Sequence, residues 1–147
     1  MAGAFRASGK YGFCVTHPLM FDPDDPLLER VRGIALALPE AQEKISHGRV
    51  AFFTQKVFAY YSGSLKVDGE WVQHPQSIVV QADTAEREVL RRMPGTFVPA
   101  YLGVSGWTGL DLGPETDWTL VRELVEESFR VTAPARLVAQ LDRPATG

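Results

Sequence analysis

The spacing of apolar residues changes along the chain, and this change predicts the type of each element. In the first well-patterned segment, Asp25-Pro26 is a favourable helix start, with aspartate at the N-cap and proline at the first helical position. The apolar residues that follow share one side of a helical wheel: Leu27, Leu28, Val31, Ile34, Ala35 and Leu38. Pro39 ends the pattern, so we predict a core-facing helix before it.

From Ala41 onward, short runs rich in β-branched and aromatic residues predict a series of strands. The runs cover residues 44–46, 50–53, 57–61, 65–67, 70–72 and 77–81. His47-Gly48 and Asp68-Gly69 separate consecutive runs, and Asp-Gly favours a two-residue type I′ turn because both central residues need positive φ. We expect Pro75 to break the chain before the last run.

Two further helices flank one more predicted strand. Asp83 is a helix N-cap with Glu86 at the third helical position, and this helix should end near Met93. Residues 97–112 then join a Pro/Gly-rich turn to an alternating run, which predicts the last strand, with both neighbouring helices packed on it. Asp117 caps the final helix, and residues 135–141 could add one more turn.

The order of these elements predicts an α+β fold. Hairpins dominate, so we expect a two-layer structure with a mainly antiparallel sheet of about five strands and three main helices on one face. The chain of 147 residues is long enough for one domain and too short for two ordinary ones. We expect an N-terminal tail over 1–24, one domain over 25–141 and a C-terminal tail over 142–147.

Composition and charge indicate the class of protein and its cellular compartment. The chain is 45% hydrophobic and 22% charged, as in ordinary soluble proteins. Its net charge of −3 provides no general attraction to nucleic acid or to anionic membranes. No apolar run approaches the ~20 residues that span a bilayer, and a single cysteine, Cys14, suits a reducing compartment. A cytoplasmic protein without a membrane partner is expected.

The residues that commonly bind metals are too scattered to suggest a site. His17, His47 and His74 are far apart in the sequence and lack metal-ligand spacing. Cys14 and His17 could supply two ligands, but nothing nearby supplies a third. We therefore expect no metal and no other cofactor.

No motif points to catalysis. Ser46 and His47 are neighbours on a predicted strand, where adjacent side chains point to opposite faces, so they cannot act as nucleophile and base. Gly103, Gly106 and Gly109 resemble a phosphate-binding loop but lead into a strand, whereas such loops lead into a helix N-terminus. We predict no catalytic residues and no enzymatic activity.

Charge distribution gives one candidate binding surface. Residues 44–66 contain Lys44, Arg49, Lys56 and Lys66 and no acidic residue, a local charge of +4 that leaves −7 for the remainder. These four side chains could contact DNA phosphates. Alternatively, they cover a solvated sheet face and protect strand edges from aggregation.

Three further residues are candidates for a ligand or partner surface: His47, Trp71 and His74. Trp71 lies two residues after the Asp68-Gly69 turn on an otherwise polar hairpin. It is either exposed for binding or folded back onto the sheet, and single exposed apolar residues are common on protein surfaces.

Several short motifs together resemble the MmcQ/YjbR family. The similar segments are Glu43–Phe58 with its Ser-His-Gly turn, Ile78–Leu90, Phe97–Leu112 and Ser128-Phe129. They occur in the family's order and spacing over about residues 26–140. The resemblance implies a compact α+β domain of the CyaY-like or secretion-chaperone-like type, with a sheet and hairpins in a double-wing arrangement.

The resemblance also bears on function, because members of this family are often described as DNA-binding. This sequence has Gln81 where many members have lysine, and Val104-Ser105 where polar or basic residues are common. Both differences remove charge and weaken the nucleic-acid hypothesis. Non-specific DNA binding remains the first hypothesis and a protein-interaction module the second, because fold alone does not fix function. An enzyme comes last.

Overall fold

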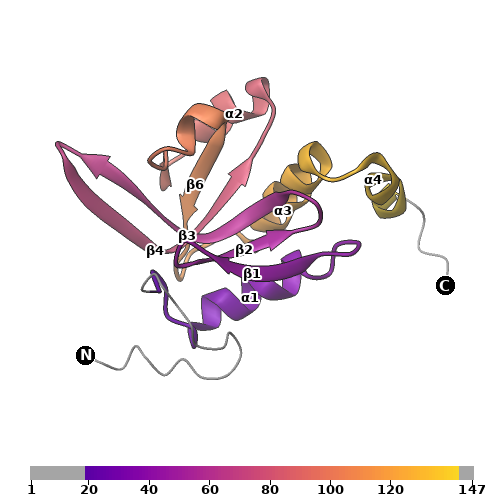
Figure 1. Cartoon of the computed structure of the whole chain (residues 1–147). Helices are drawn as coiled ribbons and strands as arrows, with labels where there is room; N and C mark the ends of the chain where they lie inside the picture. The colour runs from indigo at the N-terminus through magenta and orange to yellow at the C-terminus, as the bar shows by residue number, and fades with distance from the viewer. Residues whose placement is uncertain (1–18, 143–147) are drawn as a thin grey trace.

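A six-stranded antiparallel sheet forms the centre of the computed structural model, which describes residues 19–142 (Figure 1). Its elements, in chain order, are α1 (Pro26–Ala35), β1 (Gln42–Ser46), β2 (Arg49–Phe53), β3 (Val57–Val67), β4 (Glu70–Gln81), α2 (Thr84–Arg91), β5 (Thr96–Phe97), the short 3₁₀ helix η2 (Gly103–Ser105), β6 (Trp107–Asp111), α3 (Trp118–Thr132) and α4 (Ala135–Asp142). The strands lie in the spatial order β1-β2-β3-β4-β6-β5. No helix among the described residues is long and apolar enough to cross a membrane.

The predicted α+β class and antiparallel sheet are confirmed. The sheet has one strand more than the five predicted, because β5 contains only two residues and is too short for a visible alternation of side chains. The helix α4 occupies the segment where the sequence suggested one additional turn.

Local signals placed the helix starts and hairpin turns correctly. Asp25, Asp83 and Asp117 each accept a hydrogen bond from a backbone amide two or three residues later, at 2.9–3.2 Å. The central residues of both predicted two-residue turns have positive φ: His47 52°, Gly48 82°, Asp68 53° and Gly69 81°. The first helix, however, ends at Ala35, before Pro39.

The break expected at Pro75 does not occur. Strand β4 continues through this residue from Glu70 to Gln81. The pairing of β3 with β4 is irregular there, since the register shifts between Tyr61 and Gly63. A bulge leaves residues without a ladder hydrogen bond, so a proline, which has no N–H, fits inside the strand at this position.

The helices cover one face of the sheet. The large hydrophobic cluster includes Ile78 and Val80 of β4 together with residues of all four α-helices. Phe58 of β3 and Phe129 of α3 are fully buried in it and meet edge to face, with ring centroids 5.3 Å apart. Helix α3 packs mainly on β3 and β4, whereas α2 contacts β5 and the Trp107 strand β6, as expected. Leu110 of β6 belongs to the same hydrophobic cluster as Val121, Val125 and Phe129 of α3.

Two polar contacts join helices to strands within this layer. The hydroxyl of Ser128 in α3 donates to the carbonyl of Phe58 at 2.5 Å and accepts from the amide of Gln81 at 2.8 Å. The N-cap Asp25 accepts from the Tyr61 hydroxyl at 2.9 Å and from the Gln76 side-chain amide at 3.1 Å. Burial and the Asp25 carboxylate raise the pKa of Tyr61.

Packing begins before the helix α1. Phe21 is buried and meets Tyr61 edge to face, with ring centroids 6.4 Å apart. The amide of Met20 donates to the carbonyl of Gly48 at 2.7 Å. Residues 1–18 and 143–147 of the expected tails, which include Cys14 and His17, lie outside the described residues.

Candidate functional site

The sheet face opposite the helices, here called the open face, is defined by one row of paired residues across all six strands. The row consists of Lys44, Ala51, Tyr60, Val79, Gly109 and Phe97. Paired residues in antiparallel strands point to the same face, and neighbours along a strand point to opposite faces. Val79 therefore faces away from the helices, while Ile78 and Val80 face toward them.

One end of the open face is covered by the chain that follows α2. Val79, Phe97 and Trp107 form a small buried cluster there, and Leu102 packs against it. The ring of Phe97 lies directly over Gly109, because a Cβ on that glycine would be 2.2 Å from the ring atom Cζ. A glycine at this position is thus required for the close approach of the ring to the backbone.

His74, a predicted surface residue, belongs to this covered end. Its ring stacks on Phe97 with centroids 4.0 Å apart, and Nδ1 lies 2.7 Å from Oδ1 of Asp111. The hydroxyl of Ser77 donates to the backbone carbonyl of His74 and not to its ring. This arrangement orients the imidazole but supplies no nucleophile. Asp111 was missed from the sequence because it lies 37 residues away from its partner.

The other end of the open face, formed by β1 and β2, is here called the open end. Arg49 is its distinctive charged residue. It is two residues from Ala51 on β2 and therefore points to the same face. Its Nη2 donates to the Ser64 hydroxyl at 2.7 Å, and its Nε is buried without a hydrogen-bond partner. No carboxylate among residues 19–142 forms an ion pair with it. It is a half-buried cation without a counter-charge, which is unfavourable unless an anion or water reaches it.

Tyr60 lies near Arg49 and also contacts the covered end of the open face. The ring of Tyr60 meets that of Trp107 edge to face at 5.3 Å between centroids. Burial lowers the pKa of Arg49, and Tyr60 partly opposes this shift. Burial also raises the pKa of Tyr60, against the effect of the guanidinium. Arginine stays protonated under physiological conditions in spite of such a shift, so the open face keeps its positive charge.

Of the four predicted basic residues, the structure brings two close together. Lys44 lies on the open face with its Nζ 4.7 Å from the centroid of the Phe53 ring, and Arg49 is on the adjacent strand. Lys56 is exposed in the turn before β3. Lys66 is near the other end of β3, about 33 Å from Lys56 at 3.3 Å per residue. Lys44 and Arg49 therefore lie close together on β1 and β2, whereas Lys56 and Lys66 lie at opposite ends of β3.

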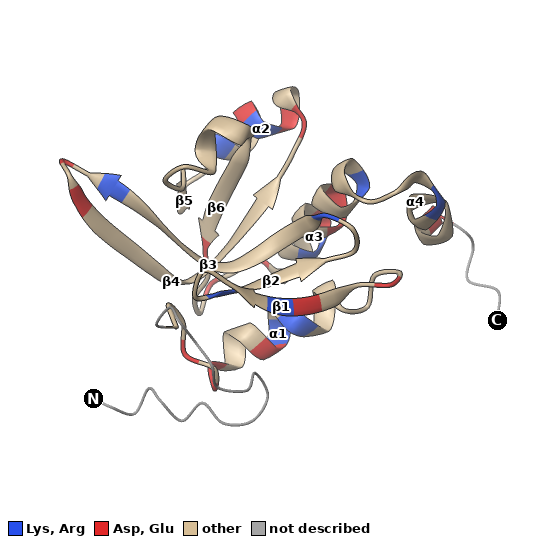
Figure 2. Cartoon of the chain, in the orientation of Figure 1, with Lys and Arg blue, Asp and Glu red and all other residues tan. Residues whose placement is uncertain are grey.

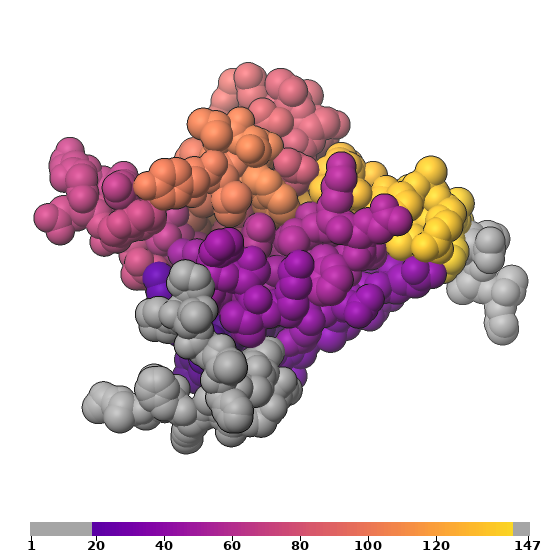
Figure 3. Space-filling model, in the orientation of Figure 1, coloured from indigo at the N-terminus to yellow at the C-terminus, as the bar shows by residue number. Residues whose placement is uncertain are grey.

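The outer half of the β3–β4 hairpin has a different surface. It protrudes from the body of the molecule (Figure 3) and carries both basic and acidic residues (Figure 2). Trp71 is 48% exposed, and its ring lies 5.9 Å from that of Tyr101 and 5.1 Å from the Lys66 ammonium. Of the two alternatives expected for Trp71, exposed or folded back onto the sheet, the structure shows the exposed one.

The remaining predicted position, His47, lies in the β1–β2 turn and not on a strand. Strand alternation therefore does not fix the direction of its side chain relative to that of Ser46. Within the part of the chain that the structure describes, no three His, Cys, Asp or Glu side chains come together to hold a metal ion.

Comparison with known proteins agrees with the fold. The YjbR family model matches residues 36–131. The chain belongs to the YjbR family. This span contains all six strands from Gln42 to Asp111 and most of α3. The resemblance expected from the sequence is therefore confirmed.

Two solved structures share the architecture. A Deinococcus radiodurans protein, DR2400, with a DUF419 domain, is 18% identical and has a TM-score of 0.56; the match covers 82% of this chain and 91% of that one. A Pseudomonas syringae protein is 19% identical and has a TM-score of 0.50; the match covers 70% of this chain and 97% of that one. At these identities the likeness shows the fold alone. No curated protein matches the chain.

Proposed function

We propose that this YjbR-family protein is a binding protein, without catalytic activity, that holds DNA weakly and without sequence preference through the open end of its sheet. The observation that carries the proposal is Arg49, a half-buried cation without an ion-pair partner among residues 19–142. A phosphate oxygen can satisfy such a guanidinium. Lys44 on the same face and Lys56 in the adjoining turn would provide two further phosphate contacts.

Geometry limits the expected affinity. Three contacts predict a slope of roughly −2.7 for log K against log salt, since each phosphate contact contributes about −0.9. The aromatic residues of the open face are largely buried, so base stacking adds little. The net charge of −3 also opposes binding. We expect a Kd within the 10⁻⁴–10⁻⁶ M range of non-specific binding.

Fluorescence anisotropy of a short labelled duplex in low salt tests this proposal. Arg49→Gln and Lys44→Gln should each weaken binding and reduce the salt slope by about 0.9. Lys66→Gln is the matched control, because it removes the same charge from the protruding hairpin, which supplies none of the three proposed contacts. The absence of binding at ~100 μM protein, above most of the non-specific range, would exclude the proposal. Equal effects of Lys44→Gln and Lys66→Gln would show that only net charge matters.

A second candidate is a protein-interaction module that uses the protruding hairpin. This hypothesis is favoured by large apolar side chains exposed there and on the adjoining segment: Val67, Trp71, Val72, Val98, Tyr101 and Val104. Contiguous exposed apolar surface often marks a protein contact. The anisotropy measurement separates the two candidates, since a module that binds only a protein partner should show no DNA binding at ~100 μM protein.

A further inference from the structure

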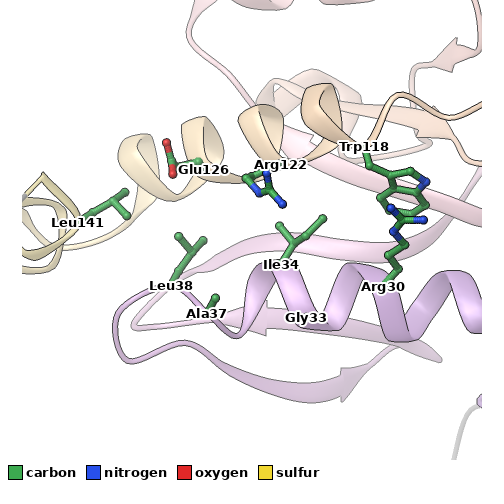
Figure 4. A pocket seen from close by; sticks show the side chains of 9 residues that line it. All are labelled: Arg30, Gly33, Ile34, Ala37, Leu38, Trp118, Arg122, Glu126 and Leu141. Carbon is green, nitrogen blue, oxygen red and sulfur yellow. The ribbon is translucent and has the colours of Figure 1, made fainter. Parts of the chain in front are cut away.

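A groove lies on the other side of the molecule, between α1 and α3, and is closed at one end by α4 (Figure 4). Its volume is about 450 Å³, within the range of small-molecule sites. The apolar part of the lining consists of Gly33, Ile34, Ala37, Leu38, Trp118 and Leu141. The groove is therefore separate from the open face and from the DNA contacts proposed above.

A glycine in the last turn of α1 keeps the groove open. A Cβ added at Gly33 would meet no atom within 4 Å. Glycine is unfavourable in a helix interior by about 1 kcal/mol relative to alanine. The fold does not require it sterically here, and the space that it leaves is part of the groove.

Two arginines give the groove a positive charge. The guanidinium of Arg30 lies 4.5 Å from the centroid of the Trp118 ring, and Arg122 extends from α3 toward Ile34 (Figure 4). Neither arginine forms an ion pair with a residue in the range 19–142. Glu126, one helical turn beyond Arg122, is the acidic residue in the lining. The lining therefore carries a net charge of +1.

We propose that this groove binds a small organic carboxylate with a flat apolar body. The apolar body would lie against Ile34, Leu38 and the Trp118 ring, while the carboxylate would accept hydrogen bonds from Arg122 and Arg30. A guanidinium binds a planar carboxylate through two parallel hydrogen bonds. The combination of apolar walls and a few convergent charged groups is typical of small-molecule sites.

Amide chemical-shift titration of the full chain tests the proposal, with 2-naphthoate as the probe. A ligand of this size should bind with a Kd of about 1 mM, and the shifts should be largest in α1 and α3. The neutral control is 2-naphthamide, which has nearly the same shape. It should bind roughly fivefold more weakly, because it lacks the exposed charge interaction.

Two pairs of variants locate the site. Gly33→Leu fills the groove and should weaken naphthoate binding roughly tenfold, whereas Gly33→Ala, which adds one methyl group to the helix, should weaken it much less. Arg122→Gln should reduce the preference for naphthoate over naphthamide. Arg92→Gln, which removes an exposed arginine at the end of α2, should leave this preference unchanged.

Three results would overturn the assignment. Shifts confined to the open face would mean that the ligand binds elsewhere. Unchanged binding to Gly33→Leu, in a variant whose spectrum shows a native fold, would exclude the groove. Equal affinities for naphthoate and naphthamide would exclude selection for a carboxylate. Each result is independent of DNA binding, since none of the variants alters Lys44, Arg49 or Lys56.

Discussion

The helix-covered face and the open face of the sheet use the same strands but are packed to different extents. Among residues 19–142, the cluster on the helix-covered face has 18 buried hydrophobic members, against three on the open face. Helices from both ends of the chain cover the first face. The second is covered at one end by Phe97 and the segment that follows it.

This difference separates stability from binding. Burial of apolar area contributes most of the favourable free energy of folding, so most of the stability of this domain should come from the helix-covered face. The open face keeps Lys44 and Arg49 near water at one end. Mutations that compare the two faces can test this division.

The largest difference should appear between two aromatic truncations. Phe129→Ala removes a fully buried ring that contacts Phe58, and should destabilise the domain by about 4–5 kcal/mol. Trp107→Ala on the open face should cost about 3 kcal/mol, because Tyr60 and Leu102 at the rim of the small cluster can move into the space. Urea denaturation measures both values, and a larger loss for Trp107→Ala would contradict the comparison.

How far the sequence predicts the structure also differs between the faces. The helix caps and hairpin turns follow from local chemistry, as at Asp25, Asp117 and Asp68-Gly69, and were predicted correctly. The α+β class follows from the change in apolar period. Strand β5 left no such signal, because two residues cannot show an alternation.

The open face depends on contacts between residues distant in sequence. The pairing of His74 with Asp111 and the position of Phe97 over Gly109 require a strand order that adjacent residues do not encode. The sequence shows four basic residues between Lys44 and Lys66, but the proximity of Lys44 to Arg49 depends on strand pairing, and the separation of Lys56 from Lys66 depends on the length of β3. Candidate residues could therefore be named from sequence, whereas their grouping could not.

A glycine substitution tests the close contact on the open face. Gly109→Ala places a methyl group against the Phe97 ring, which would have to shift, and should destabilise the domain by about 1–3 kcal/mol. Ring-current shifts of His74, which stacks on the same ring, should change in this variant. Unchanged shifts together with full stability would show that Phe97 does not lie over Gly109.

The same substitution in α1 should have the opposite effect, although smaller. Gly33→Ala adds a methyl group that meets no atom within 4 Å, in a helix whose backbone at this position is compatible with any L-residue. The alanine restricts the unfolded chain and improves helix propensity, so we expect a gain of about 0.4–1 kcal/mol in the free energy of unfolding. Thermal and urea denaturation beside Gly109→Ala measure the contrast between the two positions. A loss of stability in Gly33→Ala would mean that the space beside α1 is filled in solution, and that the groove between α1 and α3 is not open to a ligand.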